Sequence, residues 1–136
     1  MSTIDLEDFA VALMADPQAT LLRFLSLQTR GVPEQKILLQ QLRHNLQGLP
    51  QAHDAALLSG LAILRDTDLR AELPRIHQPT LVLHGMLDTL TPPAAGTWLA
   101  EALPAAQRIE FARAAHAPHL SHAKDVAAAI GRFAHV

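Results

Sequence analysis

Residues 81–88, LVLHGMLD, decide how this chain folds. A short apolar run follows Pro79 and ends at a glycine, which is typical of a parallel strand that is buried on both faces. Asp88 stands just past this strand, and two prolines then begin a helical pattern over residues 93–103. The stretch therefore predicts a strand, a loop that carries a carboxylate, and a helix.

A second strand and helix follow the first pair. Residues 108–111, RIEF, predict another short strand, residues 112–122 predict a loop, and residues 123–133 predict a last helix. Two strands with a helix between them are expected to be parallel and joined by a right-handed crossover. Because a parallel strand is normally paired on both sides, residues 80–136 are expected to need more sheet beside them.

Before residue 70 every periodic segment predicts a helix rather than a strand. Asp16 followed by proline is a strong start signal, because aspartate caps the helix and proline fits its first position. Glycine and proline pairs separate the later segments. The four expected helices lie near residues 4–13, with Ser2 or Thr3 as N-cap, and at about residues 17–29, 33–47 and 52–65.

Composition excludes several classes of protein. The 136 residues suit one domain, and a hydrophobic content of 49% is enough for a core. A net charge of -2 gives no sign of nucleic-acid binding. The absence of cysteine excludes disulfides and a thiol nucleophile, and it fits a reducing cytosol. No signal peptide or membrane-length apolar run is visible, so we expect a cytoplasmic protein without a membrane partner.

Asp88 and His116 are the candidate catalytic residues. Each follows a predicted strand, and catalytic groups in open α/β sheets gather at the carboxyl ends of the strands. In a Ser-His-Asp enzyme the aspartate orients the imidazole, and the imidazole takes the proton of the serine. Taken singly, Asp88 could be only a helix-capping residue and His116 only a solvated loop residue. The two together favour an acid-base pair.

The histidine loop also admits a metal-binding interpretation. His116, His119 and His122 recur at intervals of three, and zinc binds imidazole readily. The spacing is not that of a known zinc motif, and Asp125 is the only carboxylate close by in the sequence. We therefore expect neither a metal nor a cofactor.

Four stretches resemble the α/β-hydrolases. Residues 79–92, PTLVLHGMLDTLTP, resemble the acid loop of that superfamily, and residues 111–122, FARAAHAPHLSH, look like the histidine loop of one subgroup. That subgroup is the pimeloyl-[acyl-carrier-protein] methyl ester esterases of biotin synthesis. Residues 23–29, RFLSLQT, are similar to part of its helical lid, and residues 60–70, GLAILRDTDLR, to the return from the lid. The resemblance extends over about residues 10–136.

The resemblance implies a partial α/β-hydrolase fold. Residues 1–70 would be the helical lid, and residues 71–136 would be the last two parallel strands and helices of the core. The implied activity is carboxylic ester hydrolysis, with pimeloyl-[acyl-carrier-protein] methyl ester as the expected substrate.

The resemblance also implies roles for individual residues. Asp88 would be the triad acid and His116 the base, while Phe24 and Leu90 would line the acyl pocket. In such enzymes a basic lid surface receives the acidic acyl carrier protein, and Arg23 matches that surface best. Arg30, Lys36 and Arg43 are further candidates, although for Lys36 and Arg43 an ordinary solvated helix face is an equally good interpretation.

The nucleophile is the departure from the family pattern. No Gly-x-Ser-x-Gly occurs in the chain, and none of its serines, Ser2, Ser26, Ser59 and Ser121, stands on a strand-to-helix elbow. We therefore expect the chain alone to be inactive, as a C-terminal fragment of an esterase. Two alternatives stay open. It could be a split-enzyme subunit completed by an N-terminal half or a second copy, or a non-catalytic module that binds acyl carrier protein.

Overall fold

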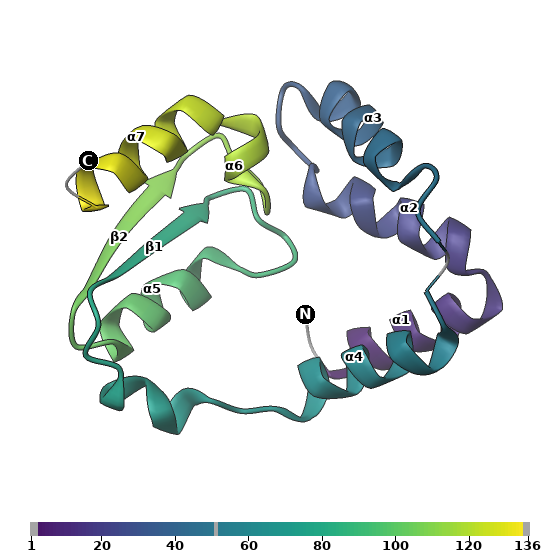
Figure 1. Cartoon of the computed structure of the whole chain (residues 1–136), viewed down its shortest axis with the longest axis horizontal. Coiled ribbons are helices and arrows are strands. Elements are labelled where there is room, and N and C mark those ends of the chain that lie inside the picture. Colours follow the sequence, from purple (N-terminus) through teal and green to yellow (C-terminus); the bar gives the residue numbers. More distant parts are fainter. Residues whose placement is uncertain (1–2, 51, 135–136) are drawn as a thin grey trace.

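The computed structural model describes residues 3–50 and 52–134, and it divides into a helical part and an α/β part (Figure 1). The helical part comes first and holds α1 (Thr3–Ala15), α2 (Pro17–Gln28), α3 (Gln35–Leu46) and α4 (Asp54–Asp66). A 3-10 helix, η1 (Arg70–Arg75), leads out of it. The α/β part holds β1 (Thr80–Gly85), α5 (Pro93–Ala102), β2 (Ala106–Phe111), α6 (Pro118–Ser121) and α7 (Ala123–Ala134).

Local signals in the sequence place the first helices. The Asp16 carboxylate accepts the backbone N–H of Ala19 at 2.9 Å, which caps α2 as predicted. Ser2 lies outside the described residues, and Thr3 is already within α1. Gly31 adopts a φ of 86°, which an L side chain rarely takes, so the chain can turn after α2. This turn delays α3, which begins at Gln35 instead of at the predicted residue 33.

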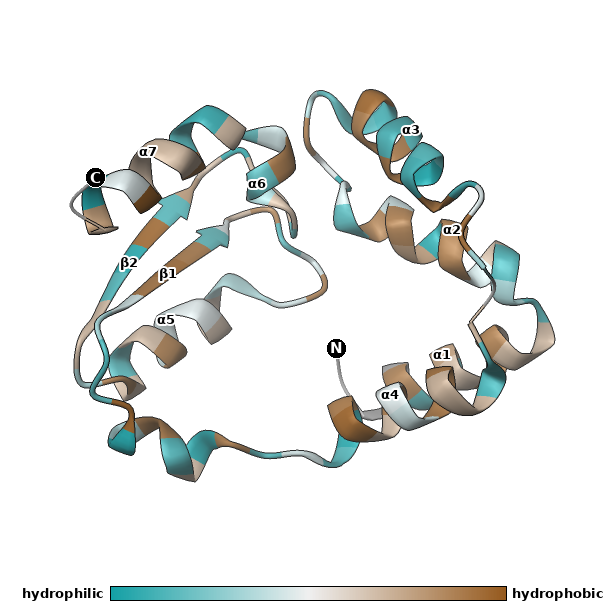
Figure 2. Cartoon of the chain, in the orientation of Figure 1, coloured by the Kyte–Doolittle hydropathy of each residue, from teal (hydrophilic) through white to brown (hydrophobic). Residues whose placement is uncertain are grey.

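The helices α1 to α4 pack side by side in the spatial order α3, α2, α1, α4. Helix α1 packs against both α2 and α4, and α2 packs against α3. The buried apolar residues of this part include Leu13, Leu25 and Leu38. Helix α4 has no buried residue, and its Ile63 side chain is 63% exposed. Figure 2 shows apolar residues on these helices as well as on the strands. Several of those on the helices, such as Val11 and Leu64, are exposed.

The two strands are parallel and paired in register from Thr80 with Ala106 to Gly85 with Phe111. The two faces of the sheet carry different helices (Figure 1). Leu83 packs with a buried cluster that includes Val126 of α7, whereas the next residue along the strand, His84, contacts α5. Because successive side chains of a strand point to opposite faces, α5 and α7 cover opposite sides of the sheet.

Only one edge of β1 has a strand partner within the described residues, because the sheet there consists of β1 and β2 alone. The sequence predicts that more sheet is needed beside β1, since a buried parallel strand normally has neighbours on both sides. None of the helices in the described ranges has the length and apolar character needed to cross a membrane.

Two short elements were not predicted from the sequence. The segment expected as a loop over residues 112–122 contains the one-turn helix α6, which begins at Pro118 because proline fits the first helical position. The 3-10 helix η1 was not predicted at all, and Pro74 lies inside it. Both are short segments whose conformation depends on packing more than on periodicity.

Candidate active site

The loop that follows β1 and the loop that follows β2 are tied together by their backbones. The Met86 N–H donates to the carbonyl of Phe111 at 3.0 Å, and the Leu87 N–H donates to the carbonyl of Ala114 at 2.9 Å. Gly85 makes this approach possible, because a Cβ at that position would overlap the carbonyl oxygen of Ala115. The two loops therefore hold each other at one end of the sheet.

Asp88 and His116 meet at this junction, as the sequence predicts. Nδ1 of His116 lies 2.9 Å from Oδ2 of Asp88. The other carboxylate oxygen, Oδ1, accepts the backbone N–H groups of Leu90 at 2.8 Å and Thr91 at 2.9 Å. The Asp88 side chain is 5% exposed and that of His116 is 38% exposed. The buried carboxylate is therefore fixed by its partners, while the imidazole reaches the surface.

This geometry determines how the imidazole can act. An ionised carboxylate only accepts hydrogen bonds, so Nδ1 of His116 carries the hydrogen that it donates to Asp88. Nε2 is then the ring nitrogen that can take a proton from another group. The arrangement can serve as a general base, with Asp88 placed to stabilise the imidazolium that forms.

A cavity of about 800 Å³ opens beside His116, between the helical part and the segment after β1. Phe24 and Leu90, both predicted as pocket residues, lie on its wall. Phe9 lies there too, and its ring centroid is 5.4 Å from that of Phe24. The cavity is mainly apolar; its other lining residues are Leu6, Leu13, Leu21, Ala56, Leu57, Gly60, Leu61, Leu64, Thr91, Pro92 and Ala95.

Sequence reasoning missed Phe9 as a lining residue. Its position in the first helical segment was visible as one of several apolar residues. Which of those residues meets Phe24 depends on how α1 crosses α2, and periodicity carries no information on that crossing.

Arginines gather next to this cavity. A second cavity of about 630 Å³ shares Phe9 and Phe24 with the first, and it adds Arg23 and Arg30 to its wall. A neighbouring groove of about 480 Å³ is lined by Arg23, Arg30 and Arg43. Three of the four basic candidates therefore converge, whereas Lys36 is exposed on α3 and lines neither space.

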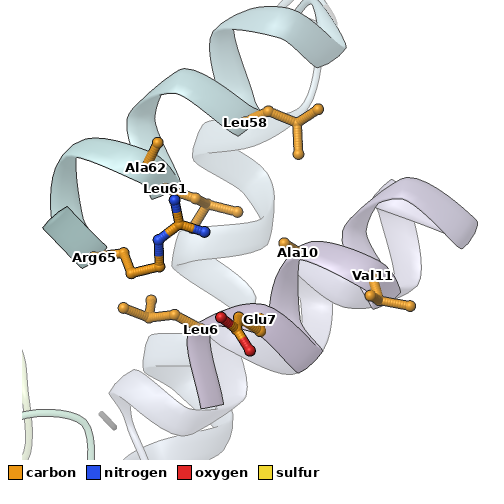
Figure 3. A pocket seen from close by; sticks show the side chains of 8 residues that line it. All are labelled: Leu6, Glu7, Ala10, Val11, Leu58, Leu61, Ala62 and Arg65. Atoms are coloured by element: carbon orange, nitrogen blue, oxygen red, sulfur yellow. The ribbon is translucent and has the colours of Figure 1, made fainter. Parts of the chain in front are cut away.

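A further groove lies between α1 and α4 and is shown in Figure 3. Its floor is apolar, and Glu7 and Arg65 face each other across it. The ion pair of Arg65 is with the neighbouring Asp66, at 2.7 Å. The residues that line this groove include neither a histidine nor a serine, so it lacks the acid-base pair of the His116 cavity.

The serines of the described ranges do not complete a triad. None of their hydroxyl groups is hydrogen-bonded to the His116 ring, and Ser121 Oγ instead bonds Nδ1 of His122 at 2.8 Å. Over the same part of the chain, no three histidine, aspartate or glutamate side chains gather closely enough to hold a metal ion.

Comparison with known proteins identifies the family of this chain. The sequence model of the alpha/beta hydrolase fold family matches residues 8–123. A pimeloyl-[acyl-carrier protein] methyl ester esterase from Aromatoleum aromaticum is 43% identical over 125 residues, which is 92% of this chain and 48% of that protein. The esterase of the same name from Nitrosomonas europaea is 43% identical over 114 residues, covering 83% of this chain and 45% of that protein. The chain thus spans about half the length of the curated relatives it matches.

Solved structures of similar fold extend over the whole chain. An esterase from Exiguobacterium antarcticum superposes with a TM-score of 0.85 at 23% identity, covering 100% of this chain and 49% of that one. An enol-lactonase from Burkholderia xenovorans superposes with a TM-score of 0.84 at 22% identity, covering 100% of this chain and 52% of that one. At this identity the likeness establishes the fold alone.

Proposed function

Because this chain belongs to the alpha/beta hydrolase fold family, we propose that it supplies the acid and the base of a serine carboxylesterase. The observation that carries the proposal is the contact of 2.9 Å between Nδ1 of His116, which lines a mainly apolar cavity, and Oδ2 of Asp88. Residues 1–70 would act as the lid over this cavity and residues 71–136 as the C-terminal part of the core.

The chemistry follows from the position of the free ring nitrogen. His116 Nε2 would take the proton of a serine hydroxyl as that oxygen attacks the ester carbonyl. The buried Asp88 carboxylate would stabilise the imidazolium, which then protonates the leaving alcohol. A water, deprotonated by the same histidine, would release the acid. The serine and the oxyanion donors would come from a Gly-x-Ser-x-Gly half, either on a longer chain or on a separate one.

The proposed substrate is the methyl ester of a pimeloyl group on acyl carrier protein. The relatives that share 43% identity are named for this reaction. A mainly apolar cavity beside His116 suits an acyl chain. The groove of Arg23, Arg30 and Arg43 suits an acidic carrier, because positive charge steers and orients an anionic partner. Such a substrate would place the protein in the cytoplasm.

The test is reconstitution. This chain is mixed with the part of the Aromatoleum aromaticum relative that it does not match, and conversion of the methyl ester to free pimeloyl-carrier is followed by mass spectrometry. We expect activity only in the mixture, and a loss on the order of 10⁴-fold with Asp88→Asn, because the wrong imidazole tautomer is then favoured. Asp125→Asn, on the exposed start of α7, is the matched control and should retain full activity. Equal activity of the two variants would contradict the proposal.

A split-enzyme subunit is the second candidate function. The edge of β1 that has no strand partner in the described ranges favours it, because such an edge is a template for another strand. The added strand would come from the complementary half or from a second copy of this chain. Sedimentation velocity separates these: a folded monomer that stays monomeric until the half is added excludes self-assembly.

A further inference from the structure

His84 is a largely covered histidine close to the acid-base pair but outside it. Its side chain is 11% exposed and lies between β1 and α5. Gly96 leaves room for the ring, because a Cβ at that position would overlap Nδ1 of His84. The ring is therefore held on the side of the sheet that α5 covers, one residue before the strand ends at Gly85.

The hydrogen bond of His84 reaches the loop that fixes Asp88. Nε2 of His84 lies 3.0 Å from the carbonyl oxygen of Thr91. A carbonyl oxygen only accepts, so Nε2 carries the hydrogen. The N–H of Thr91 in turn donates to Asp88 Oδ1 at 2.9 Å. Thr91 therefore links the two side chains: its carbonyl accepts from His84, and its amide donates to Asp88.

The same nitrogen also stands beside the other carboxylate oxygen. His84 Nε2 is 3.6 Å from Asp88 Oδ2, the oxygen that accepts from His116 Nδ1. This separation exceeds a hydrogen-bond distance, so the N–H dipole acts on the carboxylate without competing with His116 for it. In a buried site such a dipole is weakly screened.

We propose that His84 is a positioning residue that keeps Oδ2 of Asp88 directed at His116 by bracing the loop through Thr91. The inference rests on the proposed function of the pair. It differs from the simple alternative, a packed histidine that only fills space, because it requires the N–H donor and not just the ring.

The experiment reads the tautomer of His116 by ¹⁵N NMR in the full chain, without any need for activity. Three variants separate donor from volume. His84→Phe keeps a ring and removes the donor, and His84→Asn shortens the side chain so that its amide falls short of Thr91. His84→Gln places an amide N–H near the position of Nε2. His77→Asn, in the exposed segment before β1, is the matched control.

In the wild type, in His77→Asn and in His84→Gln, we expect His116 to hold its hydrogen on Nδ1. In His84→Phe and His84→Asn the Nε2–H tautomer should increase roughly fivefold, the size of one net hydrogen bond. If His84→Phe does not fold, the His116 tautomer in His84→Asn is the deciding measurement. An unchanged tautomer in a folded donor-less variant, or no rescue by glutamine, would overturn the inference. A tautomer shift without activity in the reconstituted enzyme would reject the proposed function and leave this inference standing.

Discussion

Gly85→Ala should destabilise the fold by pushing apart the two loops that carry Asp88 and His116. A Cβ at Gly85 would lie 2.5 Å from the carbonyl oxygen of Ala114 and would overlap that of Ala115. Both obstacles are backbone atoms, so relief requires movement of the loop that carries His116. Overpacking of this kind costs about 1–3 kcal/mol, and we expect the upper end because no flexible side chain can give way.

The assay is urea unfolding followed by circular dichroism. With a slope of about 2 kcal/mol per molar urea, a loss of about 3 kcal/mol lowers the midpoint by about 1.5 M. Gly60→Ala is the matched control, because nothing lies within 4 Å of its added Cβ and it stands inside α4. Alanine there should stabilise the chain by roughly 0.5–1 kcal/mol. Equal midpoints for the Gly85 variant and the wild type would refute the reasoning.

Three further outcomes are expected. Asp16→Ala removes the cap on the Ala19 N–H and should cost about 1 kcal/mol in the same urea assay, whereas Asp16→Asn should cost much less. Phe24→Ala should raise KM for the acyl substrate in the reconstituted enzyme more than it lowers kcat, because the ring lines the cavity and is not a member of the acid-base pair. The Arg70 guanidinium lowers the pKa of Asp68 from 3.8 to about 2. This pair therefore stabilises the fold above about pH 4, and the contribution is lost as the pH falls through 2. An NMR titration of Asp68 should find a midpoint of about 2, and Arg70→Gln should return the midpoint toward 3.8.

The sequence was informative about the site wherever a local rule applied. Asp88 and His116 could be paired in advance because each follows a strand, and parallel strands end at the same side of a sheet. Asp16 could be named as a cap because its effect reaches only three residues along the chain. These features depend on near neighbours, and the structure contains them where they were expected.

The remainder depended on contacts between distant elements. Phe9 joins the cavity only because α1 crosses α2 at a particular place, and His84 meets Thr91 only once the loop after β1 has closed. Helix α4 shows the opposite case: the sequence predicted the helix, but it gave no indication that Ile63 would stay exposed within the described structure. An apolar pattern identifies a surface suited to burial, but not the element that covers it.

Labelling with a fluorophosphonate probe tests most directly the central claim that this chain supplies the base and not the nucleophile. We predict no adduct on the chain alone. In the mixture with a Gly-x-Ser-x-Gly half, the adduct should form on the serine of that half and should be lost with His116→Ala. An adduct on Ser26, Ser59 or Ser121 that His116→Ala abolishes would contradict the account.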